Sequence, residues 1–92
     1  MQVMKALEQA AEMQPNLFIC SAYEWSDYWI FPYSDSPNPD FVQMDGPIIK
    51  IHKITGDSKY MLLSDHDFFD ILKNKKAAHL PEGVLPYSAR QQ

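Results

Sequence analysis

The sequence predicts an α+β protein, a single small domain in the order α-β-β-β-β-α with a four-stranded antiparallel meander. Three observations predict it. Apolar residues recur at helical spacing near the start, two pairs of strand-like segments each surround a tight turn, and a segment with a helix-capping residue follows. A length of 92 residues suits one hydrophobic core, so we expect residues 1–92 to form one domain with both helices packed on one face of the sheet.

The first helix is predicted over residues 2–14. Val3, Leu7 and Ala10 recur at the spacing of one helical turn, while charged residues occupy the other positions. Pro15 ends this pattern because proline cannot continue a helix.

An antiparallel hairpin is predicted next. Residues 17–23 and 28–33 are rich in apolar and aromatic side chains, and the polar turn at residues 25–27 separates them. Even and odd positions of the second strand are both apolar or aromatic, so neither of its faces is polar and both have side chains suited to burial.

A surface loop at residues 34–40 separates this hairpin from a second one. Two prolines and several small polar residues make the loop unsuitable for a sheet. Residues 48–53 then alternate between isoleucine and polar side chains, and residues 58–63 return as the fourth strand. Gly56 supplies the positive φ that the short connection needs.

The second helix is predicted to begin at Ser64 as N-cap, with Asp67 three residues further on. Acidic residues at its start and lysines at residues 73–76 match the helix dipole, which favours a structural reading of these charges. The remaining segment is expected to lie against the body of the domain, with residues 88–92 as a loose tail.

Charge is distributed unevenly along the chain. Residues 6–49 have no lysine or arginine, and all eight basic residues lie outside this segment. The segment holds seven carboxylates: Glu8, Glu12, Glu24, Asp27, Asp35, Asp40 and Asp45. This distribution favours a basic protein partner over nucleic acid, since phosphate binding depends on clustered Lys and Arg.

The candidate partner-binding site lies in this acidic and aromatic segment. It combines residue types that are common at interface hot spots with charges that steer a basic partner. Its members are Tyr23, Glu24, Trp25, Asp27, Tyr28, Asp35 and Asp40. We expect Trp25 to be displayed at the turn and Trp29 to fill the core.

No catalytic residue, cofactor or metal is expected. The three histidines lack the spacing of a helical metal site, and the single cysteine, Cys20, sits in an apolar segment. Asp65 and Asp67 flank His66, but neighbours on a helix point about 100° apart and do not converge on one ion. The loop from Asp35 to Asp40 lacks the glycine and the terminal glutamate of an EF-hand loop.

Residues 48–70 carry a resemblance to known families. They contain a strand, the turn Lys53-Ile54-Thr55-Gly56-Asp57, a second strand and an acidic-capped helix. This arrangement, which follows an N-terminal helix and an aromatic hairpin, is similar to some small bacterial immunity proteins and to PepSY-like domains. The resemblance covers about half the chain and implies a binding role without catalysis.

The function expected from these features is that of a non-catalytic protein-binding domain, such as an immunity or inhibitor protein, whose acidic and aromatic surface caps a basic partner. Two alternatives stay open: a structural or regulatory homodimer paired through a sheet edge, and a small-ligand binder with an aromatic pocket. Residues 1–8 lack a signal peptide's apolar segment and no stretch reaches spanning length, so we expect a cytoplasmic protein with no membrane partner.

Overall fold

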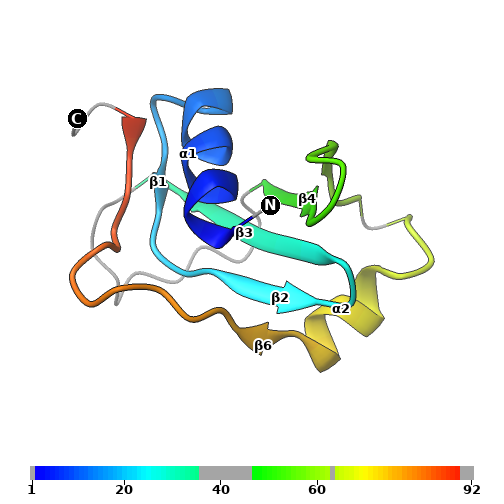
Figure 1. Cartoon of the computed structure of the whole chain (residues 1–92). Coiled ribbons are helices and arrows are strands. Elements are labelled where there is room, and N and C mark those ends of the chain that lie inside the picture. Colours follow the sequence, from blue (N-terminus) through cyan, green and yellow to red (C-terminus); the bar gives the residue numbers. More distant parts are fainter. Residues whose placement is uncertain (1, 36–46, 63, 90–92) are drawn as a thin grey trace.

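A single antiparallel sheet lies between two helices (Figure 1). The computed structural model describes residues 2–35, 47–62 and 64–89. Along the chain the elements are α1 (Val3–Met13), β1 (Phe18–Ile19), β2 (Tyr23–Trp25), β3 (Tyr28–Ser34), β4 (Ile48–His52), β5 (Ser58–Tyr60), α2 (Phe68–Asn74) and β6 (Lys76–Ala77). This arrangement belongs to the α+β class that the sequence predicts.

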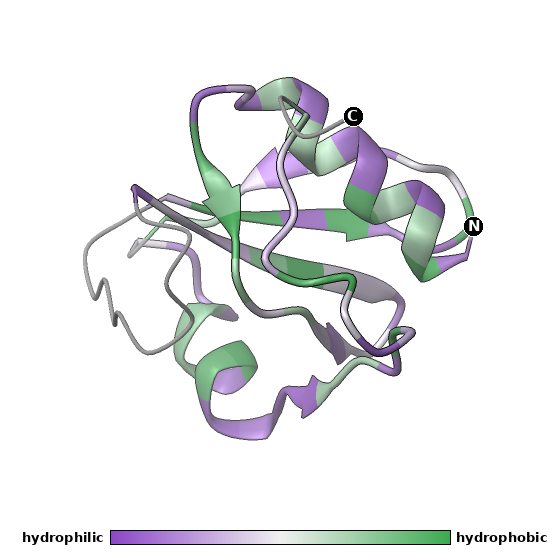
Figure 2. Cartoon of the chain, turned by 90° about the vertical axis from the view of Figure 1, so that its left-hand side faces the viewer, coloured by the Kyte–Doolittle hydropathy of each residue, from purple (hydrophilic) through white to green (hydrophobic). Residues whose placement is uncertain are grey.

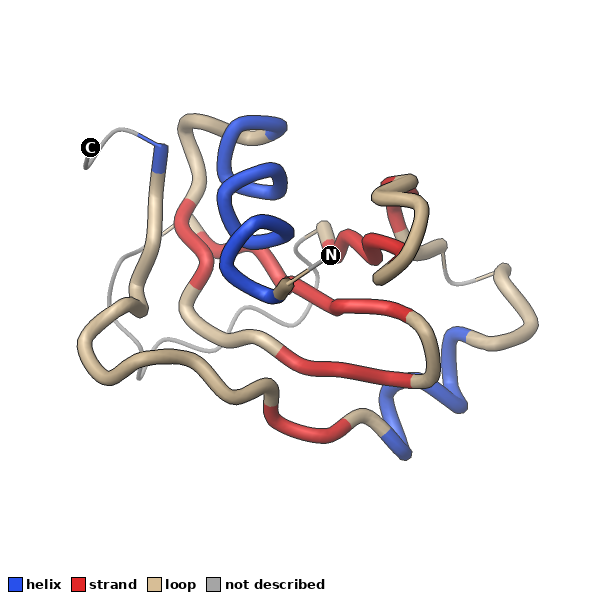
Figure 3. Tube along the Cα trace, viewed as in Figure 1, coloured by secondary structure: helices blue, strands red, loops and turns tan. Residues whose placement is uncertain are grey.

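The sheet is built around β3, its longest strand. The strand order is β5-β4-β3-β2-β6, and β1 also pairs with β3 (Figure 3). β2 to β5 follow the order of the predicted meander, but β6 extends the sheet beyond β2 and was not predicted. Both residues of β6 are exposed, so no alternation of apolar and polar residues marks it in the sequence. Of the predicted loop at residues 34–40, residues 36–40 lie outside the described part of the chain.

The strand predicted over residues 17–23 is interrupted, and Pro32 explains the break. Ile19 pairs with Tyr33, and β2 resumes with one extra residue on the β1–β2 side, as at a β-bulge. The backbone N–H of Tyr33 donates to Pro47 on the β4 side, so the nitrogen of Pro32 faces β1 and β2. Because proline has no N–H, the ladder cannot continue across this point.

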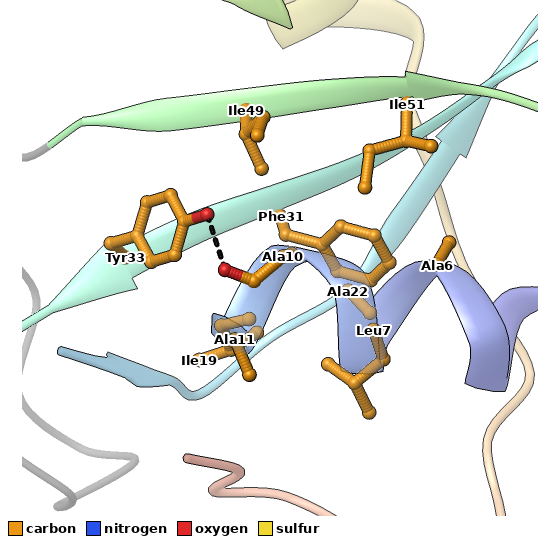
Figure 4. Close-up of a cluster of buried hydrophobic side chains, with 10 residues drawn as sticks. All are labelled: Ala6, Leu7, Ala10, Ala11, Ile19, Ala22, Phe31, Tyr33, Ile49 and Ile51. Atoms are coloured by element: carbon orange, nitrogen blue, oxygen red, sulfur yellow. Dashed lines mark hydrogen bonds between the residues drawn. The ribbon is translucent and has the colours of Figure 1, made fainter. Parts of the chain in front are cut away.

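Each face of the sheet is covered by one helix (Figure 2). The larger core lies on the α1 side, and its buried members are Ala6, Leu7, Ala10, Ala11, Ile19, Ala22, Phe31, Tyr33, Ile49 and Ile51 (Figure 4). The smaller core on the α2 side contains Ile30, Met61 and Ile71. The prediction that both helices pack on one face is therefore wrong. β3 is apolar on both faces, and each apolar face is buried by its own helix.

α1 agrees closely with the prediction and is tied to the sheet. Its alanines at positions 6, 10 and 11 are buried and allow a close approach to the strands. The hydroxyl of Tyr33 donates a hydrogen bond of 2.7 Å to the carbonyl oxygen of Ala10 (Figure 4). Burial raises the pKa of Tyr33 above its ordinary value, with a smaller contribution from Tyr60.

α2 begins after Asp67 and not after Ser64, the predicted N-cap. The carboxylate of Asp65 instead accepts a hydrogen bond of 2.9 Å from the backbone N–H of Leu62, which closes a turn before the helix. Asp67 makes no side-chain capping bond, because its carboxylate is engaged by Lys50.

The C-terminal segment packs against the body of the domain. Ile19 and Tyr87 exchange backbone hydrogen bonds of 2.8 and 2.9 Å. Ser88, which we expected at the start of a loose tail, is buried with 1% of its surface exposed. Residues 90–92 of that tail lie outside the described residues. Within the described residues, neither helix has the length and apolar character needed to cross a membrane.

Candidate protein-binding surface

The candidate residues are divided between the two faces and the two ends of the sheet. β2 carries Tyr23, Glu24 and Trp25, and its alternation sends Tyr23 and Trp25 to the α2 face but Glu24 to the opposite face. Tyr28 pairs with Trp25 across the hairpin and shares its face. Asp27 is exposed in the connecting turn, where Ser26 adopts a φ of 52°.

Trp25 joins the hairpin to α2. Its indole Nε1 donates a hydrogen bond of 3.0 Å to Oδ2 of Asp70, and the side-chain amide of Asn74 donates one of 2.6 Å to Oδ1. The rings of Trp25 and Tyr28 are stacked, with centroids 6.3 Å apart and planes 25° apart. Both hydrogen-bond donors to the exposed carboxylate of Asp70 are neutral groups. We call the group of Trp25, Asp27, Tyr28 and Asp70 the Trp25 corner.

Glu24 belongs to a separate ion pair on the α1 face. Its carboxylate accepts a hydrogen bond of 3.1 Å from the ammonium of Lys53. The same ammonium lies 4.5 Å from the centroid of Trp29. Glu24 is thus neutralised by a base from the other half of the sequence. Trp29, which we expected to fill the core, is only partly buried and packs at the margin of the larger core.

Lys50 forms the second ion pair, on the α2 face. Its ammonium lies 3.1 Å from Oδ2 of Asp67, and 9% of the Lys50 side chain and 23% of the Asp67 side chain are exposed. The hydrogen bond from Lys50 lowers the pKa of the Asp67 carboxyl, and partial burial opposes this shift. The same ammonium lies 4.9 Å from the ring centroid of Tyr28, and Lys75 covers Tyr23 at 4.8 Å. The rings of Tyr23 and Tyr28 are therefore each already in contact with a lysine ammonium of the same chain.

The other carboxylates of the acidic segment lie away from the Trp25 corner. Asp35 is exposed after the far end of β3, a seven-residue strand; such a strand spans about 23 Å. Glu8 and Glu12 on α1 lie near Tyr87, whose pKa is raised by burial and by these two charges. Asp40 lies outside the described residues. The acidic segment does not form one acidic surface over the described part of the chain.

The titratable side chains of the described residues are engaged in local contacts. Within residues 2–35, 47–62 and 64–89, no three His, Cys, Asp or Glu side chains gather closely enough to hold a metal ion. Nδ1 of His52 accepts hydrogen bonds from the backbone N–H groups of Ile54 and Thr55, at 3.1 and 3.3 Å. Burial raises the pKa of the Cys20 thiol, while a hydrogen bond involving Ser34 partly opposes this effect.

No significant match to this chain is found among protein-family models, curated proteins or solved structures. The likeness to immunity proteins and PepSY-like domains therefore stays a prediction.

Sequence reasoning missed the part of the surface that α2 contributes. No role for Asp70 was predicted from the sequence, yet its carboxylate is the hydrogen-bond partner of Trp25. Its placement on the helical turn facing the hairpin depends on α2 covering the opposite face from α1, which the sequence pattern did not reveal. The one available signal was the apolar character of both faces of β3.

Proposed function

We propose that this chain is a non-catalytic protein-binding domain of the immunity or inhibitor kind, and that the Trp25 corner contacts a basic protein. The observation that carries the proposal is the hydrogen bond between the Trp25 indole and the Asp70 carboxylate on the exposed side of α2. It holds a half-buried aromatic ring beside a carboxylate that forms no ion pair with a base in the described part of the chain.

Two physical arguments support this surface. Tryptophan and tyrosine held in fixed positions contribute strongly to protein interfaces because little side-chain entropy is lost on binding. Asp27 and Asp70 are both exposed and have no ion-pair partner among the described residues, so they attract a cationic surface and raise the association rate at low salt.

The two alternative functions have less support. The edge strands β5 and β6 have three and two residues, and each carries an exposed lysine, Lys59 and Lys76. Short edges bearing lysine oppose pairing between sheets. The space between the sheet and α2 is filled by Ile30, Met61 and Ile71, which leaves the aromatic residues at the margin of a packed core.

The test is affinity capture with a charge-reversed variant of the corner. The purified chain is the bait for a bacterial lysate at roughly 50 mM salt, followed by elution at roughly 500 mM salt, which screens exposed charges. Asp27→Lys changes the corner, and Glu82→Lys makes the same change in net charge at an exposed turn of the C-terminal segment. We expect wild type and Glu82→Lys to retain the same basic protein, and Asp27→Lys to retain at least about fivefold less.

Equal retention by the two variants would show that the corner is not the contact surface. If the wild-type bait retains no specific protein at either salt concentration, the proposal of a basic partner fails.

A further inference from the structure

A half-buried histidine organises the turn at residues 53–57, which we call the β4–β5 turn. Nδ1 of His52, the last residue of β4, accepts hydrogen bonds from the backbone N–H groups of Ile54 and Thr55, at 3.1 and 3.3 Å. The backbone N–H of His52 donates to the carbonyl oxygen of Asp57, and its carbonyl oxygen accepts from Gly56, at 2.8 and 3.0 Å. Ile54 is 78% exposed, so burial of its side chain contributes little to holding the turn.

The two hydrogen bonds to Nδ1 define the protonation state of the ring. Both donors are backbone N–H groups, so Nδ1 of His52 carries no proton and the neutral imidazole has its proton on Nε2. A protonated imidazole is a donor at both nitrogens, and no rotation of the ring then offers an acceptor to Ile54 or Thr55. Uptake of one proton therefore removes both hydrogen bonds at once.

The β4–β5 turn is joined to the Trp25 corner at two points. The backbone N–H of Lys53 donates a hydrogen bond of 2.7 Å to the carbonyl oxygen of Asp27. The rings of His52 and Tyr28 meet edge to face, with centroids 5.1 Å apart, and Tyr28 stacks in turn on Trp25. The turn and the corner therefore share one polar and one aromatic contact.

The charges near His52 come from several elements. The ammonium of Lys50 lies 4.9 Å from the centroid of the Tyr28 ring that His52 also contacts, and Asp57 follows the Ser58 pairing position and so lies opposite His52. The titratable groups on the neighbouring elements are Lys50 and Lys53 beside it in the chain, Asp57 and Lys59 across the turn, Asp27 and Tyr28 of the β2–β3 hairpin, and Asp67 of α2. Lys50 is already paired with Asp67, and Asp57 is exposed to solvent, which screens its attraction. The two hydrogen bonds to Nδ1 therefore decide which form of the ring the turn accepts.

We propose that His52 is a protonation switch, which holds the β4–β5 turn in place when neutral and releases it when protonated. Histidine takes up its proton between about pH 5 and 8, so the two hydrogen bonds are present in neutral solution and are lost as the pH falls through this range. The proton also adds a positive charge beside the Trp25 corner, which weakens the attraction for a basic protein. This last consequence rests on the proposed function, whereas the switch itself does not.

The test is amide hydrogen exchange, followed by NMR from about pH 7.5 to about pH 5, with each rate divided by that of an unstructured peptide at the same pH. We expect the protection of the Ile54 and Thr55 amides to fall at least about fivefold, in step with the proton signals of the His52 ring. His52→Asn is the matched variant, because its side-chain oxygen can accept the same hydrogen bonds and takes up no proton. We expect its protection to stay constant, and that of His52→Ala to be low throughout.

The amide of Tyr33, which bonds to Pro47, reports on the sheet and should keep its protection at every pH. Protection of Ile54 and Thr55 that stays constant while the His52 ring titrates would overturn the proposal. An equal loss in His52→Asn, or a parallel loss at Tyr33, would also overturn it. Capture of a basic partner has no part in these measurements, so the switch and the proposed function can fail independently.

Discussion

Lys50 is a nearly buried cation in the middle of β4, and its burial could not be predicted from its sequence neighbours. Because it alternates with Ile49 and Ile51, the pattern indicated a solvent-facing side chain. In the structure that face is covered by α2, and the ammonium is held by Asp67 and the ring of Tyr28. The alternation correctly predicted that Lys50 lies on the opposite face from Ile49 and Ile51. It did not predict that Lys50 is buried there by contact with α2.

The two members of this ion pair are expected to differ in their effect on stability. Asp67→Asn leaves the ammonium of Lys50 nearly buried without a counter-charge, and we expect it to lower the free energy of unfolding by about 2 kcal/mol. Lys50→Met keeps the apolar stem and leaves a carboxylate that reaches water, so we expect a loss of about 1 kcal/mol. Urea denaturation of both variants at neutral pH measures the difference, and the reverse order would contradict this account.

The pH dependence gives an independent check of the same pair. Because the folded-state pKa of Asp67 is lowered, its contribution is present above the ordinary carboxyl pKa and is lost as pH falls through the lowered value. The stability gap between wild type and Asp67→Asn should therefore stay constant between about pH 5 and 7 and shrink below about pH 4. A gap that does not change in acid would exclude ionisation of Asp67 as its source.

Among the elements, those defined by local chemistry were predicted best. Gly56 has a φ of 76° in the connection between β4 and β5, as its sequence position predicts. α1 ends one residue from each predicted limit, because periodicity and Pro15 define it locally. The break between β1 and β2 depends on Pro32 of the partner strand, and β6 depends on where α2 ends. These features arise from contacts between distant segments, so a local pattern does not contain them.

The attachment of α1 to the sheet can be tested at Tyr33. Tyr33→Phe removes the buried hydrogen bond to Ala10 and leaves the ring in place, so we expect a loss of about 1 kcal/mol in the free energy of unfolding. Tyr23→Phe is the matched control, because the described residues offer no hydrogen bond to its hydroxyl, and we expect it to be neutral. Chemical denaturation of both variants measures this, and equal effects would mean that the Tyr33 hydroxyl contributes nothing.

At the scale of the whole molecule, folding brings one carboxylate of the acidic segment against a base from the rest of the sequence. Glu24 from the acidic segment pairs with Lys53, and the sheet makes this possible by placing β4 beside β3 and close to β2. The sequence predicted the fold class and a four-stranded meander, but it did not reveal whether the carboxylates of residues 8–45 share one face, and those that the structure describes lie in different places. Topology decides which charges meet, and only part of the topology follows from local signals.

The unequal cover of the two sheet faces gives the molecule two regions of different local stability. Among the described residues, the core on the α1 side has ten buried members and the core on the α2 side has three. We therefore expect α2 to open without unfolding the α1 side. We expect the amide hydrogens of Ile71 and Lys75, bonded within α2, to exchange with solvent at least about tenfold faster than that of Tyr33 in β3. Equal rates would indicate a single cooperative unit.

Such opening would detach Asp70 from Trp25, since Asp70 lies on α2 and Trp25 lies on β2 of the sheet. The binding surface would then exist only in molecules whose α2 is closed, and a partner bound at the Trp25 corner would slow amide exchange throughout α2.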